Sequence, residues 1–557
     1  MKSYYSIGLD FGTNSVRALL LDLFSGEEIA SETEKYPRGE LGVLLDKKNP
    51  HLARQYPGDY LVSFEKVFSK ILKKARSFGI PLDNIQGIGS DGTGSSPLPV
   101  DETATPLAFK KEFKDNLNAQ TWLWKDHTSA AEAAEITDLA RKMRPAYLKK
   151  CGGAYSSEWF FSKIFHCLKV DPKVFKTAYS WLELSDYIPA MLCGLTDVRK
   201  VKRNICAAGH KAMFHTDWGG LPEAEFLEHL SPDMAELMNR LYSQALTSDN
   251  IAGLLSREWC RKFELPKAIP VAVGALDAHL GAVGSGVGKG IFVKIIGTST
   301  CDIMVQPDDG TELDIPGVAG IVPGSVLPGY IGIEAGQSAV GDIFNWFVSR
   351  VRNEDEKHHL VFSKHAEKLK AGESGLLALD WNNGNRNILT DPNLTGLLVG
   401  QTLHTTDYEI YRALIEATAF GARRIIEQME DHGVNIEQVI NCGGIAEKNP
   451  LVMQIYADVL HRPMHVAKSA QTVALGAAIY GGFAALKGEK GFENIEEVQS
   501  RVCRVKEKVY NPREKEVKTY QRLYQLYKKL HDGFGIKNTS LEMYPVMKEL
   551  LEIKRSA

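Results

Sequence analysis

The stretch "YSIGLDFGTNSVRALLLD", Tyr5 to Asp22, decides the fold because it places an acidic residue near the end of an apolar run, just before a Gly-Thr-Asn-Ser turn. A second apolar run, Val16 to Asp22, follows the turn, and the two runs predict a β-hairpin. No Gly-Lys-Ser/Thr follows and no helix opens after the turn, so it is not a Walker phosphate loop.

The length and composition favour a globular protein with several domains. The chain has 557 residues, which predicts two large domains or three smaller ones. With 66 basic and 69 acidic residues the net charge is -3, which gives no electrostatic reason to expect nucleic acid or a membrane as a partner. The 8 cysteines lack metal-binding spacing, and no signal peptide is recognised, so a cytoplasmic location is expected.

One uncharged stretch, Ser469 to Leu486, is about the minimum length for a membrane span. It is rich in Gly and Ala ("ALGAAIYGGFAAL"), which favours a close-packed internal helix over a membrane-spanning one.

The first half of the chain has a defined order of predicted elements. A third strand is expected in "FSGEEIASETEKY" after the Ser25-Gly26 turn. Apolar residues at helical spacing predict a helix from Asp59 to Gly79, and Ile85 to Ser90 returns to strand. The predicted order is therefore three strands, a helix and a strand.

The second half repeats this order in part. Val293 to Gln306, "VKIIGTSTCDIMVQ", is again a strand, a Gly-Thr-Ser turn and a strand. A helix is expected over Tyr408 to Gln428, a strand over Val439 to Cys442 and a helix over Asn449 to Leu460. Two facing copies of one α/β unit would be the organisation of the actin-like ATPases. Because strand-Gly-Thr-strand turns are common, the turns alone leave the duplication open.

The two turns have the chemistry of phosphate binding. Backbone N–H groups and hydroxyls can face phosphate oxygens at Gly12, Thr13 and Asn14 and at Gly297, Thr298 and Ser299. Asp10 would repel a phosphate, so its expected role is to hold Mg²⁺ through water. Arg17 could reach a phosphate from the next strand, or it could be a solvated strand arginine.

A candidate general base lies in "VAVGALDAHLGAVGSG", Val271 to Gly286. Asp277 stands there among small and apolar residues, where a carboxylate is poorly solvated and a substrate can approach closely. The alternative is that Asp277 caps the helix that its neighbours predict, and capping does not exclude catalysis.

Over about 450 residues the chain resembles the FGGY carbohydrate kinases. The resemblance is carried by nine stretches in family order: "GLDFGTNSVRALLLD", "GSDGTGSSPLPVD", "LWKDHT", "YSSEWFFSKIFH", "AAGHKAMFHTDWGGLP", "VKIIGTSTCDIM", "IGIEAGQSAVGDIFNWF", "ALIEATAFGAR" and "GGIAEKN". It implies an α/β protein with two actin-like (ribonuclease H-like) ATPase domains flanking a central cleft. The implied sugar-binding domain is 1–287, the nucleotide-binding domain is 288–511, and 512–557 is a helical extension.

The resemblance also implies roles for individual residues. Asp277 is the implied catalytic base, and Asp10 the implied contact to water-bound Mg²⁺. The implied nucleotide-binding residues, counting those near the transferred phosphate, are Thr13, Asn14, Arg17, Gly297, Thr298, Gly341, Asn345, Gly443, Gly444 and Lys448. The implied sugar-binding residues are Thr93, Trp124, Asp126, Tyr155, Lys211, Asp277 and Glu334.

The residues themselves support these sugar contacts unequally. Trp124 offers an apolar face for sugar C–H groups, and Asp126 a carboxylate for hydroxyls. Tyr155 could instead be a buried aromatic residue with a satisfied hydroxyl. Lys211 is expected in a loop after small residues, where a surface lysine is the alternative. Glu334 is expected to be a loop carboxylate that binds sugar or makes an internal ion pair.

The implied reaction is ATP-dependent phosphorylation of a ketopentose, with Mg²⁺ as the metal. L-Ribulose is the expected substrate, phosphorylated on its C5 hydroxyl in L-arabinose catabolism, and a homodimer is left open. The alternatives are another ketose or polyol kinase, such as one for xylulose, and an actin-like ATPase that works by conformational change. Two positions depart from the family pattern: Gln401 replaces an aliphatic residue, and Asn14 replaces a hydroxyl residue.

Overall fold

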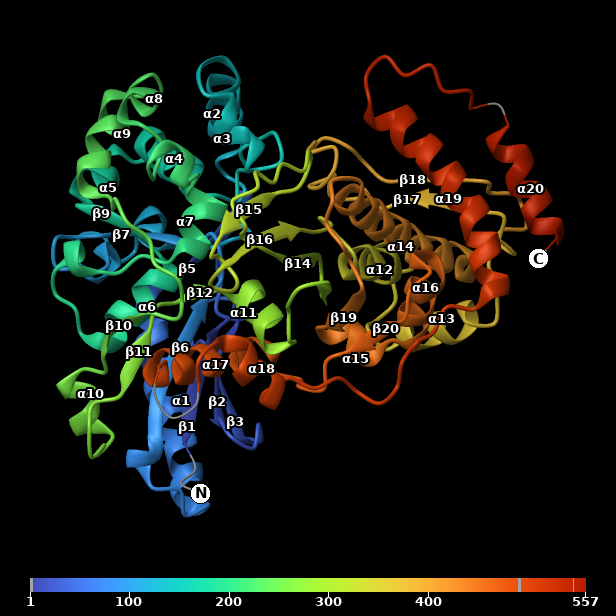
Figure 1. Ribbon diagram of the computed structural model, residues 1–557. Helices are drawn as coiled ribbons and strands as arrows, with labels where there is room; N and C mark the ends of the chain where they lie inside the picture. Colours follow the sequence, from blue (N-terminus) through green and yellow to red (C-terminus); the bar gives the residue numbers. More distant parts are fainter. Residues whose placement is uncertain (1–3, 489–491, 544, 557) are drawn as a thin grey trace.

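The computed structural model describes residues 4–488, 492–543 and 545–556, and the predicted hairpin forms at the start of the first sheet (Figure 1). β1 (Tyr5–Phe11) and β2 (Ser15–Asp22) pair antiparallel, as predicted. On the other side of β1, β6 (Ile85–Gly92) runs parallel to it. The sheet order is β10-β11-β6-β1-β2-β3, with β10 at Ile251–Leu254, β11 at Pro270–Ala272 and β3 at Glu28–Lys35.

A second sheet repeats this arrangement. β13 (Ile291–Ile296) and β14 (Thr300–Pro307) form an antiparallel hairpin, and β19 (Gln438–Cys442) runs parallel to β13. The order is β15-β16-β14-β13-β19-β20, with β15 at Gly320–Pro323, β16 at Tyr330–Ala335 and β20 at Met464–Val466. β13, β14 and β19 thus correspond to β1, β2 and β6, and the predicted duplication is confirmed.

The long predicted helices form at the expected places. They are α1 (Pro57–Ser77), α14 (Asp407–Asp431) and α16 (Pro450–Leu460). The predicted order of three strands, helix and strand omitted a hairpin between β3 and α1. Its strands are β4 (Leu44–Asp46) and β5 (Asn49–Gln55); β4 has only three residues, and neither shows the apolar alternation that marks a strand.

The apolar Gly/Ala stretch forms α17 (Thr472–Leu486), which packs against the first sheet although it follows the second in the chain. Glycines allow the close approach: a Cβ on Gly8 would lie 1.8 Å from the Ala474 carbonyl oxygen, and one on Gly89 1.8 Å from that of Ala477. The internal-helix interpretation is therefore confirmed. Among the described residues no helix combines the length and the apolar character needed to cross a membrane. The predicted domain boundary at residue 287 assigns α17 to the second unit, whereas α17 packs against the sheet of the first.

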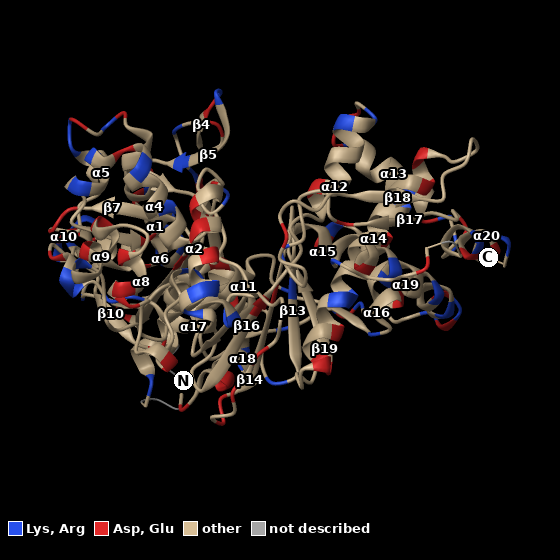
Figure 2. Ribbon diagram, turned by 90° about the horizontal axis from the view of Figure 1, so that it is seen from above, with Lys and Arg blue, Asp and Glu red and all other residues tan. Residues whose placement is uncertain are grey.

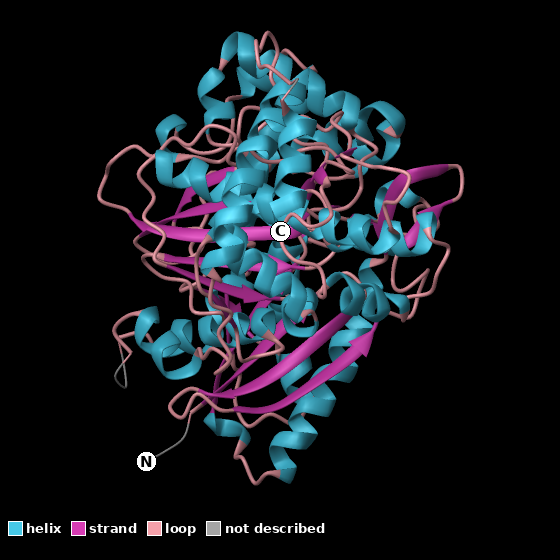
Figure 3. Ribbon diagram, turned by 90° about the vertical axis from the view of Figure 1, so that its right-hand side faces the viewer, coloured by secondary structure: helices cyan, strands magenta, loops and turns pink. Residues whose placement is uncertain are grey.

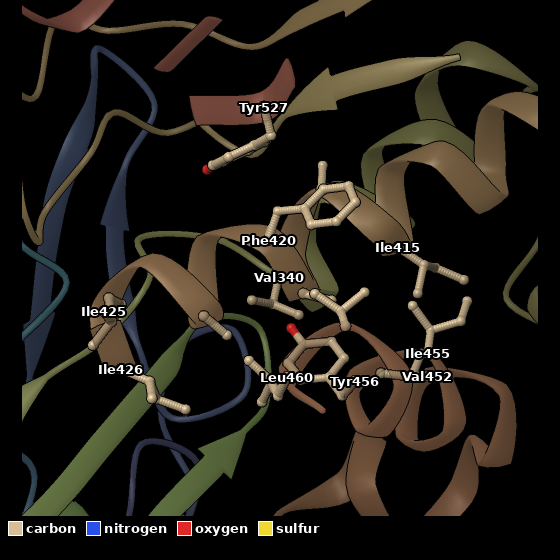
Figure 4. Packing of buried hydrophobic residues seen from close by; sticks show 14 of the residues in the cluster. Val340, Ile415, Phe420, Ile425, Ile426, Val452, Ile455, Tyr456, Leu460 and Tyr527 are labelled. Atoms are coloured by element: carbon tan, nitrogen blue, oxygen red, sulfur yellow. The ribbon is translucent and has the colours of Figure 1, made fainter. Parts of the chain in front are cut away.

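The C-terminal segment contributes to the second core. α19 (Glu514–Gly535) buries Tyr520, Tyr524 and Tyr527 against α14, and Figure 4 shows Tyr527 close to Phe420, with ring centroids 5.4 Å apart. The Tyr520 hydroxyl donates to Glu416 at 2.8 Å. This helix is therefore an integral part of the second unit, and the shorter α20 (Val546–Ser556) follows it.

Helices surround the strands of the second unit, and in Figure 3 several of them stand in front of its sheet. Basic and acidic side chains are interspersed over both units in Figure 2, in keeping with the small net charge.

Candidate active site

The first hairpin places Asp10 and Arg17 opposite each other. The two residues are paired across β1 and β2, and Arg17 Nη1 donates to Asp10 Oδ2 at 2.7 Å. Asp10 is 3% exposed, whereas the Arg17 side chain is 41% exposed. In the turn, Asn14 is exposed and its Nδ2 donates to the Leu41 carbonyl at 2.6 Å. Arg17 is thus a partner of Asp10 before any phosphate arrives.

Asp277 is the first residue of α11 (Asp277–Gly284), at the edge of the first sheet. Leu276 holds the N-cap position, and Asp277 Oδ1 accepts from the next amide, that of Ala278, at 2.8 Å. The capping alternative is therefore wrong. Burial, and next the charge of Asp10, raises the pKa of Asp277 to about 7, which suits a general base near neutral pH.

Asp91, at the end of β6, is a third carboxylate in this region, and sequence reasoning assigned it no role. Because β1 and β6 are parallel, Asp91 lies beside Asp10, while Ala275 of β12 (Ala275–Leu276) lies on its other side. Burial and the charges of Asp10 and Asp277 raise the pKa of Asp91 well above its usual range, opposed only in part by Arg17 and the Phe11 amide. The sequence does show an acidic residue at the end of a buried strand. The register that sets Asp91 beside Asp10, however, could not be predicted from the sequence.

This group of carboxylates fits a divalent cation. Asp10, Asp91 and Asp277 would carry three negative charges when ionised; the Arg17 guanidinium lies against Asp10 and acts on Asp91, and Lys211 acts on Asp277. Among the described residues, neither carboxylate oxygen of Asp91 has a hydrogen-bond partner of ordinary distance and angle. Hard oxygen ligands with excess negative charge are the chemistry that Mg²⁺ requires.

Trp124 connects the first turn to the loop after β6. Its indole Nε1 donates to Thr13 Oγ1 at 3.0 Å, and its backbone N–H donates to Ser96 Oγ at 3.1 Å. Ser96 Oγ in turn lies 2.8 Å from Thr93 Oγ1, which is buried. Two predicted sugar contacts, Thr93 and Trp124, are therefore held in one hydrogen-bonded chain with Thr13 of the first hairpin turn.

The second hairpin turn meets two helix starts. The Gly341 amide donates to the Gly297 carbonyl at 3.1 Å, and the Asp342 amide donates to that of Thr298 at 3.0 Å, so α12 (Gly341–Asn345) begins on the turn. Gly443, which precedes α15 (Gly444–Lys448), has φ +91°, and a Cβ there would lie 2.6 Å from the Ile296 carbonyl oxygen.

Only some of the residues predicted to bind the nucleotide lie together in the structure. Gly297, Thr298, Gly341 and Gly443 converge at the end of β13. Gly444, Asn345 and Lys448 are exposed at the neighbouring helices, and their contacts to nucleotide stay predictions.

Lys211 and Glu334 form a buried ion pair between the two halves of the chain. Lys211 Nζ donates to Glu334 Oε1 at 2.7 Å and to Oε2 at 2.9 Å. Burial, the largest single cause, would raise the pKa of Glu334, but the charge of Lys211, its hydrogen bonds and the neighbouring histidines together hold that pKa below its usual range. Both were expected in loops, which is wrong: Lys211 is on α7 (Ile205–Ala212), whose N-terminus the Asn204 side chain caps, and Glu334 is on β16.

Two histidines that sequence reasoning missed surround this carboxylate. His210 Nδ1 lies 3.3 Å and His279 Nε2 3.6 Å from Glu334 Oε2, and both rings are buried. Burial lowers the pKa of His279 to about 4 and that of His210 well below its usual range, so both imidazoles are neutral near pH 7. His279 is two residues from Asp277, which brings the ion pair close to the candidate base.

Asp126 and Tyr155 support the site from within the protein. Asp126 is fully buried, forms an ion pair with Arg54 and accepts from the Ala53 amide at 2.7 Å. The Tyr155 hydroxyl donates to the Lys211 carbonyl at 2.6 Å and accepts from the Phe161 amide at 3.0 Å. Tyr155 is the buried aromatic residue of the alternative reading, and it holds the helix that carries Lys211.

Arg386 is a further residue that the sequence did not reveal. It lies between β17 (Leu377–Leu379) and β18 (Leu397–Val399), and its Nη2 is 3.7 Å from Glu158 Oε1 in the first half. The charges of Glu158 and, more weakly, Glu334 help to raise its pKa. Like the Lys211–Glu334 pair, this ion pair therefore joins the two halves of the chain.

Comparisons with known proteins agree with this geometry. The N-terminal domain of the FGGY family of carbohydrate kinases matches residues 5–284, and its C-terminal domain matches 292–485. A ribulokinase of Geobacillus thermodenitrificans is 40% identical over 550 residues, covering 96% of this chain and 95% of that protein. One of Vibrio parahaemolyticus is 41% identical, covering 86% and 88%. The xylulose kinase structure of Rhodospirillum rubrum has a TM-score of 0.76 at 21% identity, covering 95% and 98%.

The duplicated unit, its two hairpins and these matches define a two-domain kinase fold of the actin-like ATPase type. The chain belongs to the FGGY family of carbohydrate kinases. Family membership sets aside the alternative of an actin-like protein that works without phosphorylating a sugar. The central cleft of the predicted fold stays a prediction.

Proposed function

We propose that this kinase transfers the γ-phosphoryl group of ATP to the C5 hydroxyl of L-ribulose. Asp277, a partly buried carboxylate with a pKa raised to about 7 beside Asp10 and Asp91, is the observation that carries the reaction type. Relatives named ribulokinase, 40% identical over nearly the whole chain, support the sugar. Such a step belongs to L-arabinose catabolism.

Asp277 would take the proton of the attacking hydroxyl. Its carboxylate has one hydrogen-bond donor at Oδ1, the Ala278 amide, which leaves accepting capacity for a substrate hydroxyl. Phosphoryl transfer requires little covalent participation by the protein, so position and charge supply most of the catalysis. A primary hydroxyl at the end of a ketopentose can reach Asp277 and align with the phosphate.

The two turns would hold the phosphates. Thr13 and Asn14 with Arg17 would face the transferred group, while Gly297 and Thr298 would offer amides and a hydroxyl from the other unit. Residues at the starts and ends of α12 and α15 would contact the rest of the nucleotide, namely Gly341, Asn345, Gly443, Gly444 and Lys448. Asp10 would hold Mg²⁺, through water, and the metal supplies positive charge to the phosphate oxygens.

The sugar would lie against Trp124 and between the first unit and the Lys211–Glu334 pair. Lys211 has donors and Glu334 has acceptors for the carbonyl and secondary hydroxyls. A site with buried polar groups of this kind rejects analogues that leave those groups unpaired. Asp126 and Tyr155, whose polar atoms are already engaged, would position this site rather than bind the sugar directly.

A substrate panel tests the proposal. ADP release would be measured with L-ribulose, D-ribulose, both xyluloses, glycerol and gluconate, and the product position assigned by phosphorus-coupled NMR. The expected result is the highest kcat/KM for L-ribulose with phosphate on C5, and lower activity for the other pentuloses. Faster phosphorylation of glycerol or gluconate than of any pentulose would overturn the substrate, and a phosphate on another carbon would overturn the position.

A further inference from the structure

Asp91 occupies the middle of the carboxylate group at the end of the first sheet. It lies in register with Asp10 on β1, and its other neighbour, Ala275, is two residues before Asp277. Neighbouring residues of parallel strands direct their side chains to the same face of the sheet. The backbone therefore brings Asp91 between the carboxylate expected to hold metal and the candidate base.

The side chain of Asp91 is buried without an ion-pair partner of its own. It has 0% exposure, and among the described residues neither oxygen has a hydrogen-bond partner of ordinary distance and angle, although the Phe11 amide and the Asp10 carboxyl lie close to it. Other buried carboxylates of this unit are paired: Asp126 with Arg54, and Asp186 with Asn204, whose side-chain amide donates at 2.6 Å. Leaving a buried carboxylate unpaired costs stability, so Asp91 is placed for a ligand rather than for the fold.

The charge of the group indicates which ligand. When ionised, Asp10, Asp91 and Asp277 would bring three negative charges to a place where Arg17, whose side chain is 41% exposed, is already bonded to Asp10 and Lys211 is engaged by Glu334. One divalent cation would balance this excess. A neutral sugar hydroxyl would not, and a phosphate would increase it. Mg²⁺ is bound in proteins through one or two carboxylates together with waters and substrate phosphates.

We propose that Asp91 is a second magnesium-binding carboxylate, acting beside Asp10 directly or through a bound water. The inference rests on the proposed use of a magnesium nucleotide. Asp91 would then share the cation with Asp10 and leave Asp277 free to accept the proton from the sugar.

Binding of Mn²⁺ as a spin probe for Mg²⁺ tests this assignment without measuring turnover. Free Mn²⁺ would be quantified by electron paramagnetic resonance in the presence of the full chain and a non-hydrolysable ATP analogue. Asp91→Asn keeps the shape and removes the charge, and should weaken Mn²⁺ binding about tenfold or more. In EDTA the same variant should bind the analogue as tightly as the parent or more tightly, since one negative charge near the phosphates is gone.

Asp59→Asn is the matched control. Asp59 is another carboxylate buried in the first unit, 2% exposed, and its partner is Arg38 at 3.5 Å rather than a site residue. This variant should bind Mn²⁺ like the parent. Asp91→Ser is a second, smaller replacement in case Asp91→Asn does not fold, and it should show the same loss.

The possible results distinguish failure of the Asp91 assignment from failure of the proposed magnesium-dependent reaction. Unchanged Mn²⁺ affinity in folded Asp91 variants would overturn the assignment, and so would a loss of L-ribulose affinity with Mn²⁺ binding intact, because Asp91 would then be a sugar contact. If the parent chain binds the analogue but gains nothing from Mn²⁺, the proposed magnesium-dependent reaction fails and the assignment fails with it.

Discussion

Lys211 Nζ lies 2.7 Å from Glu334 Oε1, although Lys211 belongs to α7 in the first half of the chain and Glu334 to β16 in the second. Both side chains are almost fully buried, at 7% and 9% exposure. Taking two charges out of water is costly, and only their close pairing offsets it. The contact between the two halves and the charges in the proposed sugar site therefore depend on the same ion pair.

Lys211→Met should disturb stability and sugar use together. It leaves Glu334 buried without a counter-charge, which costs on the order of 3–5 kcal/mol. Thermal unfolding should begin at a lower temperature, and calorimetric affinity for L-ribulose should fall more than affinity for an ATP analogue. Lys66→Met is the control, because Lys66 is 53% exposed in its pair with Glu34, and such pairs contribute about 1 kcal/mol or less. Equal sugar affinity in Lys211→Met and the parent would remove the pair from the site.

The pH dependence of kcat/KM should report Asp277. A general base acts in its deprotonated form, and burial raises its pKa to about 7 from an ordinary value of 3.8. Activity should therefore rise with pH through about 7 and level off above it. The profile would be measured at constant ionic strength and saturating nucleotide, between pH 5.5 and 8.5, which is roughly 1.5 units on each side of that pKa. A flat profile over this range would argue against Asp277 as the titrating base.

Both hairpins could be predicted from sequence because each has two apolar runs separated by a Gly-Thr turn, a local pattern. Asp277 could be found for a similar reason, since its small neighbours are adjacent in the chain. Its capping role could not be excluded, because the N-cap falls on Leu276 only once the strand before it is placed.

Contacts between segments that are distant in the chain could not be predicted from the sequence. The position of Asp91 beside Asp10 depends on the register of two parallel strands that are separated by α1. Lys211 was expected in a loop because small residues precede it, whereas the Asn204 cap and packing between the halves keep that segment helical. The docking of α17 on the first sheet depends on glycines far away in the chain, such as Gly89.

Gly89→Ala should therefore destabilise the first unit. The added methyl would lie 1.8 Å from the Ala477 carbonyl oxygen of α17, and backbone on both sides limits relaxation. Overpacking of this kind typically costs about 1–3 kcal/mol, measured as a lower midpoint in denaturant or thermal unfolding. Gly288→Ala is the control, since the nearest atom to its Cβ would be at 3.8 Å and its φ is not positive. Equal stability of the two variants would mean that α17 does not pack as described.

The turnover number of Asp277→Asn with L-ribulose is the most direct test of the central claim that Asp277 is the base for sugar phosphorylation. The amide keeps the shape of the side chain but cannot accept the proton, so kcat should fall at least about a hundredfold. Affinity for an ATP analogue should stay within a few-fold of the parent, and the Asp59→Asn control should keep its activity. If Asp277→Asn phosphorylates L-ribulose within a few-fold of the parent rate, Asp277 is not the base and the account is contradicted.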